Sequence, residues 1–109
     1  MKLGDYKTRR WKIKRELILK RDKYICRECK RYGRTTQANT VHHIYPLGEH
    51  PEYAWISINL ISLCNKCHES MHNRFKNVLT EKGVAWKKRI EIELNVKYKK
   101  LVGVSKIIN

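Results

Sequence analysis

The hydrophobic and polar positions of the N-terminal half predict one helix and two strands. Between Lys7 and Arg21, a few apolar residues stand among basic ones, as on an amphipathic helix: Trp11, Leu17, Ile18 and Leu19. The segment NTVHHIY, residues 39–45, predicts a strand, and INLISLC, residues 58–64, predicts a second one. Two prolines and a glycine mark the segment from Pro46 to Ser57 as the loop between them.

Side chains alternate between the two faces of a strand, which separates the histidines of the first strand. Val41, His43 and Tyr45 are expected on one face, and His42 and Ile44 on the other. Because adjacent side chains on a strand point to opposite faces, His42 and His43 cannot easily bind the same group. The two residues are therefore expected to differ in function.

The C-terminal half predicts two more helices. NKCHESMHNRFKNVL, residues 65–79, indicates a helix with Met71, Phe75 and Val78 on its inner side. Beyond Thr80, one set of apolar residues fits a helix and another fits a strand. The helical set is Trp86, Ile90, Leu94 and Tyr98, and the alternating set is Ile90, Ile92, Leu94 and Val96. We favour a helix to about Leu94.

Length and charge restrict the class of protein. The 109 residues make one small domain, 1–109, which is short of the size that buries a generous core without a cross-link. The net charge of +15 indicates a polyanionic partner, with nucleic acid as the leading candidate. The alternatives are a merely soluble charged surface and an assembly protein of a ribosome or capsid. No run approaches the roughly 18 apolar residues of a membrane span, and the N-terminus lacks the apolar centre of a signal peptide, so a cytoplasmic location is expected.

The four cysteines form two matched C-x-x-C pairs, CREC with Cys26 and Cys29 and CNKC with Cys64 and Cys67. In a reducing compartment, such pairs favour one tetrahedral zinc ion over two disulfides or scattered core thiols. The gap between the pairs is longer than the roughly 15 to 20 residues of a simple zinc ribbon, and it contains the histidine pair. The apolar side of the N-terminal helix is expected to face this zinc knuckle.

Three or four histidines are expected to meet near that zinc site. His68 and His72 are four residues apart and would share one face of the predicted helix. If this helix packs across the two strands, one histidine of the pair 42–43 joins them around an ion, while its neighbour approaches from the side. Three ligands leave open positions for water and substrate, which is typical of a catalytic metal site.

The motifs RDKYICREC, VHHIYP, NLISLCNKCH and the final His72 resemble, in order and spacing, those of the HNH endonucleases. The resemblance runs from about Arg21 to His72. It implies an α+β fold with a small ββα-metal core, a four-cysteine zinc-binding knuckle and flanking N- and C-terminal helices. The chain then divides into a basic N-terminal helix within residues 1–25, the knuckle and core over residues 26–79, and a C-terminal extension over residues 80–109.

The resemblance also implies a role for each matching residue. His43 is similar to the general base of the family, and Asn59 to the asparagine that clamps the loop between the strands. His42, His68 and His72 are similar to the ligands of the catalytic metal, although many relatives have aspartate in place of His42. Cys26, Cys29, Cys64 and Cys67 are similar to the structural zinc ligands.

The residue types present are chemically suited to phosphodiester hydrolysis. A histidine with an ordinary pKa near 6.5 is largely neutral at pH 7 and can take a proton from water. One divalent ion then suffices as the Lewis acid in phosphodiester hydrolysis. An all-imidazole shell suits Zn²⁺, Ni²⁺, Co²⁺ or Mn²⁺, and Mg²⁺ is also allowed because phosphate and water would complete its shell with oxygens.

The expected partner is double-stranded DNA, bound by a monomer or weak dimer with modest sequence preference. The residues expected to contact phosphates are Arg9, Arg10, Lys14 and Arg15 in the first helix, and Lys87, Lys88 and Arg89 near Trp86. Small members of the resembling family occur in phages, where a DNA-packaging or recombination complex is a further candidate partner. The main alternative is a non-catalytic zinc-ribbon module that binds nucleic acid, and a structural protein of a nucleoprotein assembly is a more distant one.

Overall fold

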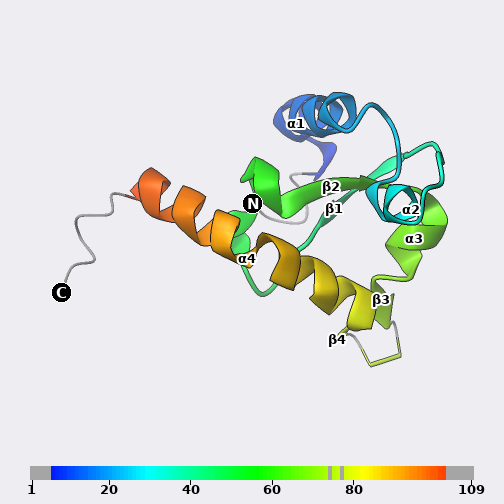
Figure 1. The fold of residues 1–109 in the computed structure, drawn as a ribbon. Helices are drawn as coiled ribbons and strands as arrows, with labels where there is room; N and C mark the ends of the chain where they lie inside the picture. Colours follow the sequence, from blue (N-terminus) through cyan, green and yellow to red (C-terminus); the bar gives the residue numbers. More distant parts are fainter. Residues whose placement is uncertain (1–5, 74, 77, 103–109) are drawn as a thin grey trace.

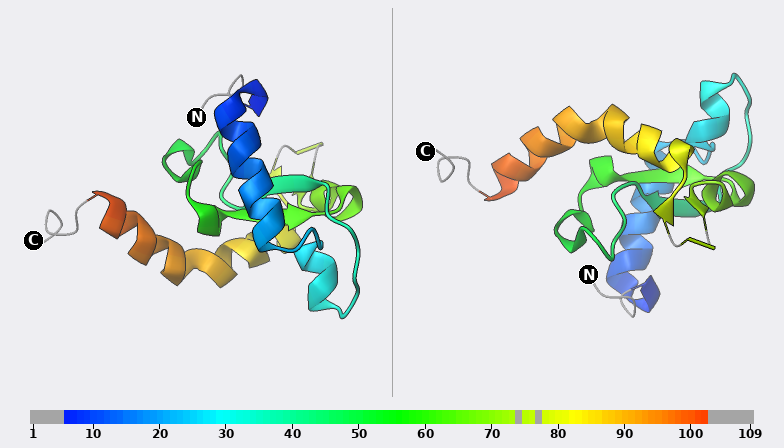
Figure 2. Two further views of the ribbon diagram at one scale, coloured as in Figure 1. Left: turned by 90° about the horizontal axis from the view of Figure 1, so that it is seen from above. Right: turned by 90° about the horizontal axis from the view of Figure 1, so that it is seen from below.

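The computed structural model describes residues 6–73, 75–76 and 78–102, and it has three layers (Figure 1). A central hairpin of two antiparallel strands, β1 (Thr40–His43) and β2 (Leu60–Leu63), lies between two helices. Helix α1 (Arg9–Arg21) crosses one face and α4 (Glu81–Val102) the other, as the views from above and below show (Figure 2). The short helices α2 (Arg27–Arg31) and α3 (Asn65–Glu69) close one end of the hairpin. This confirms the predicted α+β class with flanking helices.

Helix α1 starts and stops at recognisable signals. The Thr8 hydroxyl caps its N-terminus by accepting a hydrogen bond from the Trp11 amide at 3.2 Å. After the helix, the Asp22 carboxylate accepts the Ser62 amide at 3.0 Å and pairs with Arg21 at 2.9 Å. The helix is thereby attached at its C-terminal end to strand β2.

The apolar side of α1 faces the hairpin, so the expectation that it faces the zinc knuckle is wrong. Trp11 and Ile18 form a cluster with Leu60 of β2, against which Val41 of β1 also packs. Leu17, which we placed on the apolar side, is exposed. The reason is geometric: an apolar stripe follows residues three and four apart, and Trp11 and Ile18 define that stripe whereas Leu17 falls beside it.

Strand β2 is buried on both faces because helices cover both. Leu60 joins the α1 side, whereas Ile61 and Leu63 join the larger core that contains Trp86, Ile90 and Leu94 of α4. Each residue of β1 pairs with one of β2, and His42 lies opposite Ile61 and His43 opposite Leu60. In the described part of the chain, β1 pairs with no strand other than β2. Its other edge is therefore free.

The helix predicted over residues 65–79 is wrong beyond Glu69. Helix α3 ends at Glu69, and two short strands follow, β3 (His72–Asn73) and β4 (Val78–Leu79), which pair with each other. The Asn73 side chain accepts the amides of Phe75 and Lys76, which stabilises a turn instead of a helix. Phe75 and Val78, expected inside, are exposed, and only Met71 is buried. His72 consequently lies on a strand, not on the helix that carries His68.

The segment after Thr80 is helical, and α4 continues past the predicted end at Leu94 to Val102. Trp86, Ile90 and Leu94 are buried in the core, as expected for the helical set. The Thr80 hydroxyl accepts the Gly83 amide at the start of this helix. Among the described residues, no helix is long and apolar enough to cross a membrane.

Candidate active site

The four cysteines converge where helices α2 and α3 begin. Cys26 and Cys64 are the N-cap residues of these helices, and Cys29 and Cys67 follow in the first turns. The four Sγ atoms all lie within 4.8 Å of one another, although no disulfide joins them. Three of the four residues are buried, and Cys64 is partly exposed.

The cysteine cluster fits a tetrahedral zinc ion. A hydrogen bond with Thr36 lowers the pKa of Cys29 to about 7, whereas burial raises the pKa of Cys26 and Cys67. Buried thiols that resist ionisation in each other's company become thiolates when a cation shares the site. Four sulfur ligands complete the usual shell of structural zinc and leave no position for substrate.

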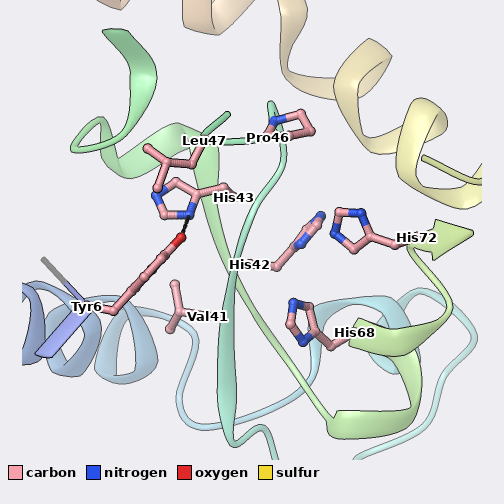
Figure 3. Close-up of a pocket in the computed structure, with 8 residues that line it drawn as sticks. All are labelled: Tyr6, Val41, His42, His43, Pro46, Leu47, His68 and His72. Carbon is pink, nitrogen blue, oxygen red and sulfur yellow. Dashed lines mark hydrogen bonds between the residues drawn. The ribbon is translucent and has the colours of Figure 1, made fainter. Parts of the chain in front are cut away.

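Three histidines form a second cluster, each from a different element. His42 comes from β1, His68 from α3 and His72 from β3, and their ligand nitrogens all lie within 4.8 Å of one another. Figure 3 shows the three rings turned toward one another. The replacement of the predicted helix by α3 and β3 therefore changes the elements that carry the histidines but still brings them together.

His42 has the properties of a metal ligand. Its side chain is 1% exposed, and its Nε2 has no hydrogen-bond partner among the described residues. Burial, reinforced by His68 and His72, lowers the pKa of His42 to about 3. A buried nitrogen without a partner is costly, but its lone pair is free for an ion at neutral pH. The donor set of three imidazole nitrogens thus fits a borderline divalent cation.

A cavity of about 240 Å³ joins the histidine cluster to His43. It is lined by Tyr6, Val41, His42, His43, Pro46, Leu47, His68 and His72. Adjacent side chains on β1 point to opposite faces, as expected from the alternation, and Figure 3 shows His42 and His43 on the two sides of the strand. Both reach one cavity because β1 has a free edge.

His43 is held by contacts on several sides of its ring. Its Nε2 donates to the carbonyl oxygen of Ala54 at 3.0 Å, and its Nδ1 lies 3.1 Å from the Tyr6 hydroxyl. The Trp11 ring stacks on the imidazole with 5.4 Å between centroids and 17° between planes. Burial lowers the pKa of His43, although the bond to Ala54 opposes this effect. The ring is therefore neutral at pH 7.

Asn59 is fully buried and fastens the loop that follows β1. Its Oδ1 accepts the Tyr45 amide at 2.7 Å, and its Nδ2 donates to the carbonyl oxygens of Tyr45 and Tyr53, both at 3.2 Å. Tyr53 immediately precedes Ala54, whose carbonyl holds His43. Asn59 therefore fixes the backbone at Tyr53 and Ala54, and this backbone in turn orients the His43 ring.

The basic residues expected to contact DNA fall in two separate layers. In α1, the Arg10 guanidinium covers the Trp55 ring at 3.9 Å, Lys14 donates to the Ser57 hydroxyl and Arg15 to a backbone carbonyl. The other group is on α4, beyond the hairpin (Figure 1).

On α4, Lys87 lies over the Tyr45 ring and Arg89 over the Trp86 ring, whereas Lys88 is exposed. Arg9 is exposed on the first turn of α1. The two groups lie on helices on opposite sides of the hairpin, which the sequence alone did not reveal.

Sequence reasoning missed Tyr6 as a residue of the cavity and placed Trp11 only in the core. Both contact His43, and both come from a segment that precedes the recognisable motifs. No local pattern identifies them, because the contacts arise only when α1 crosses β1.

The fold is a small α+β arrangement with a cluster of four cysteines that could enclose an ion and an open cluster of three histidines beside His43. Comparison with known proteins agrees with this class. A family model described as HNH endonuclease matches residues 26–74. The crystal structure of the HNH endonuclease of the deep-sea thermophilic bacteriophage GVE2, with manganese ion, is similar with 35% sequence identity and a TM-score of 0.59.

That match covers 61% of this chain and 72% of the bacteriophage chain. No curated protein matches the chain. On these grounds, the chain belongs to the HNH endonuclease family, which is a family of nucleases.

Proposed function

We propose that this protein is a metal-dependent endonuclease that hydrolyses phosphodiester bonds in double-stranded DNA, by nicking one strand or cutting both. The observation that carries the proposal is the cavity shared by the open histidine cluster and His43. Phosphodiester hydrolysis needs an activated water and a positive centre near the phosphate, and the two groups supply these functions from opposite faces of β1.

In this mechanism, His43 is the general base. The neutral imidazole carries its proton on Nε2, because the Ala54 carbonyl oxygen can only accept a hydrogen bond. The lone pair is therefore on Nδ1 and takes the proton of the attacking water. Asn59 holds the loop that contains Ala54 and so positions the base without touching the substrate.

His42, His68 and His72 are the residues that would hold the catalytic ion. When bound, a divalent ion at this site stabilises the charge that develops on the phosphate and on the leaving oxygen. Imidazole donors favour Zn²⁺, Ni²⁺, Co²⁺ or Mn²⁺, and Mg²⁺ remains a candidate if water and phosphate oxygens complete its shell. The manganese ion in the similar bacteriophage structure supports Mn²⁺ as the first ion to test.

The first turn of α1 is the strongest candidate for DNA contact near the cavity. Arg9 and Arg10 lie on the same helical turn as Trp11, which stacks on His43. On the α4 side, Lys87 contacts Tyr45, the residue before Pro46, which lines the cavity. Lys14, Arg15, Lys88 and Arg89 are proposed to contribute to the more distant phosphate contacts.

The decisive experiment compares His43→Ala with wild type in plasmid cleavage across a series of divalent metals. We expect His43→Ala to lower the cleavage rate by about a hundredfold or more, because it removes the base and leaves the three ligands. DNA affinity, measured by fluorescence anisotropy, should not change. The matched control is His50→Ala, since His50 lies outside the cavity and contacts Tyr53 and Glu52 instead.

Two results would contradict the proposal. If His43→Ala cuts as fast as wild type, His43 is not the base. If wild type binds DNA but cuts neither DNA nor RNA with any ion, the protein is the non-catalytic zinc-containing binding module that the sequence left as the alternative.

A further inference from the structure

The hydrogen bonds of His43 leave no free nitrogen on its ring. Nε2 donates to Ala54, and Nδ1 lies 3.1 Å from the Tyr6 hydroxyl. Because the neutral ring has its lone pair on Nδ1, the hydroxyl must be the donor of this second bond. The nitrogen that would accept a proton from water is therefore already occupied by a side chain of the protein.

The imidazole cannot easily turn away from this bond. Trp11 stacks on one face of the ring, and the Tyr6 ring meets it edge-on with 5.9 Å between centroids. The Ala54 carbonyl, held through the loop that Asn59 fastens, keeps Nε2 in place. A water molecule can consequently reach Nδ1 only where the Tyr6 hydroxyl now lies.

Tyr6 lies in a short 3-10 turn before α1 and is not part of that helix. It precedes the N-cap Thr8, so its backbone is not part of the hydrogen-bonded turns of α1. Its side chain lines the cavity and is only partly buried. Trp11, in contrast, is 4% exposed and belongs to the core, so it stays in place when Tyr6 leaves.

We propose that Tyr6 is a positioning residue of the active site that covers the reactive nitrogen of His43 and must withdraw before the attacking water can take its place. Tyr6 lies outside residues 26–74, so this contact is an addition from the N-terminal segment to the part of the chain that the family model matches. The inference rests on the proposed role of His43 as the base. It makes the rate of cleavage depend on how often the hydroxyl leaves.

The test is Tyr6→Phe, which removes the hydroxyl and keeps the ring that packs against Trp11 and His43. Loss of one hydrogen bond of ordinary strength should raise the single-turnover cleavage rate at saturating DNA by about two- to tenfold. The DNA dissociation constant should not change. Tyr24→Phe is the matched control, because the Tyr24 hydroxyl bonds to Glu16 on the exposed surface instead.

A second readout does not depend on cleavage. In ¹⁵N NMR spectra of histidine-labelled protein at constant pH, the Nδ1 signal of His43 should shift in Tyr6→Phe, because water replaces the tyrosine hydroxyl as the hydrogen-bond donor to this nitrogen. Tyr24→Phe should leave this signal where it is in wild type. This spectrum tests the contact even in a protein that does not cut.

The outcomes separate this inference from the proposed function. If His43→Ala abolishes cleavage but Tyr6→Phe cuts at the wild-type rate or more slowly, the covering role of Tyr6 is wrong while the base remains. An Nδ1 signal that is the same in wild type and Tyr6→Phe also overturns the inference. If His43→Ala retains full activity, the proposed function fails, and only the NMR result then bears on Tyr6.

Discussion

The cysteine cluster and the histidine cluster are both compact, but they differ in the number of potential ligands and in their access to the cavity. In both, the ligand atoms lie within 4.8 Å of one another. The cysteine cluster has four ligands, sits at the starts of α2 and α3 and does not line the cavity. The histidine cluster has three ligands and lines the cavity that also contains His43. Four protein ligands are typical of a structural zinc site, whereas three leave a position open for water or substrate, as in a catalytic site.

The two clusters are joined by consecutive residues. Cys67 belongs to one cluster and His68 to the other, and both are on the five-residue helix α3. A helix this short is not stable alone, so we expect a zinc ion bound by the cysteines to help fix α3, and with it His68, beside His42. We expect this dependence to run in one direction only, because replacing the histidines would leave all four cysteines in the chain.

The largest expected effect is loss of the folded structure when the cysteine cluster loses one of its residues. Cys26→Ser or Cys67→Ser should leave the protein unfolded or insoluble, since a structural zinc site contributes on the order of ten kcal/mol to the folding of small domains. Circular dichroism together with elemental analysis checks this result. A Cys67→Ser protein with the wild-type spectrum, or a folded wild type without zinc, would remove the distinction between the clusters.

A smaller effect, on ion binding and not on the fold, is expected when the histidine cluster loses one of its residues. His68→Ala should weaken binding of the catalytic ion by more than the roughly 10- to 100-fold that is typical of losing a residue that only supports a ligand. The fold and the zinc content should remain as in wild type. Isothermal titration with Mn²⁺ measures the ion affinity, and His43→Ala, which keeps all three ligands, is the control. If His43→Ala lost the ion and His42→Ala kept it, the roles of the paired histidines would be reversed.

The smallest expected effect is a change in which divalent ion best supports cleavage. His42→Asp replaces one nitrogen of the open shell by a carboxylate oxygen, which favours harder ions. The variant should still cut DNA, with the ratio of the rates in Mg²⁺ and Ni²⁺ shifted toward Mg²⁺. Cleavage rates in a metal series measure this ratio. An unchanged ratio would show that His42 does not contact the ion.

Local patterns predicted the parts of the site that lie in regular elements. The spacing of the cysteines predicted their cluster, and the alternation along β1 separated His42 from His43, as the structure confirms. The error over residues 65–79 has a physical origin. Met71, Phe75 and Val78 repeat at helical spacing, but the turn made by the Asn73 side chain ends any continuation of α3.

The contacts of His43 were beyond prediction for a different reason. Tyr6 and Trp11 are more than 30 residues away from it in the sequence, and they meet it only because Trp11 is buried against the hairpin. Such contacts depend on how a helix crosses a strand, which no local pattern records. The same holds for Arg10 and Trp55, which pair across α1 and the loop.

The central claim is that the cysteine cluster maintains the fold, whereas the histidine cluster supports cleavage. Stepwise chelation of the wild-type protein, with metal content, circular dichroism and plasmid cleavage followed on the same sample, tests this claim most directly. The first ion to leave should abolish cleavage without any change in the spectrum, and re-addition of Mn²⁺ should restore activity. Unfolding should occur only when zinc is also removed. A single step in which cleavage, zinc and the folded spectrum disappear together would contradict the claim.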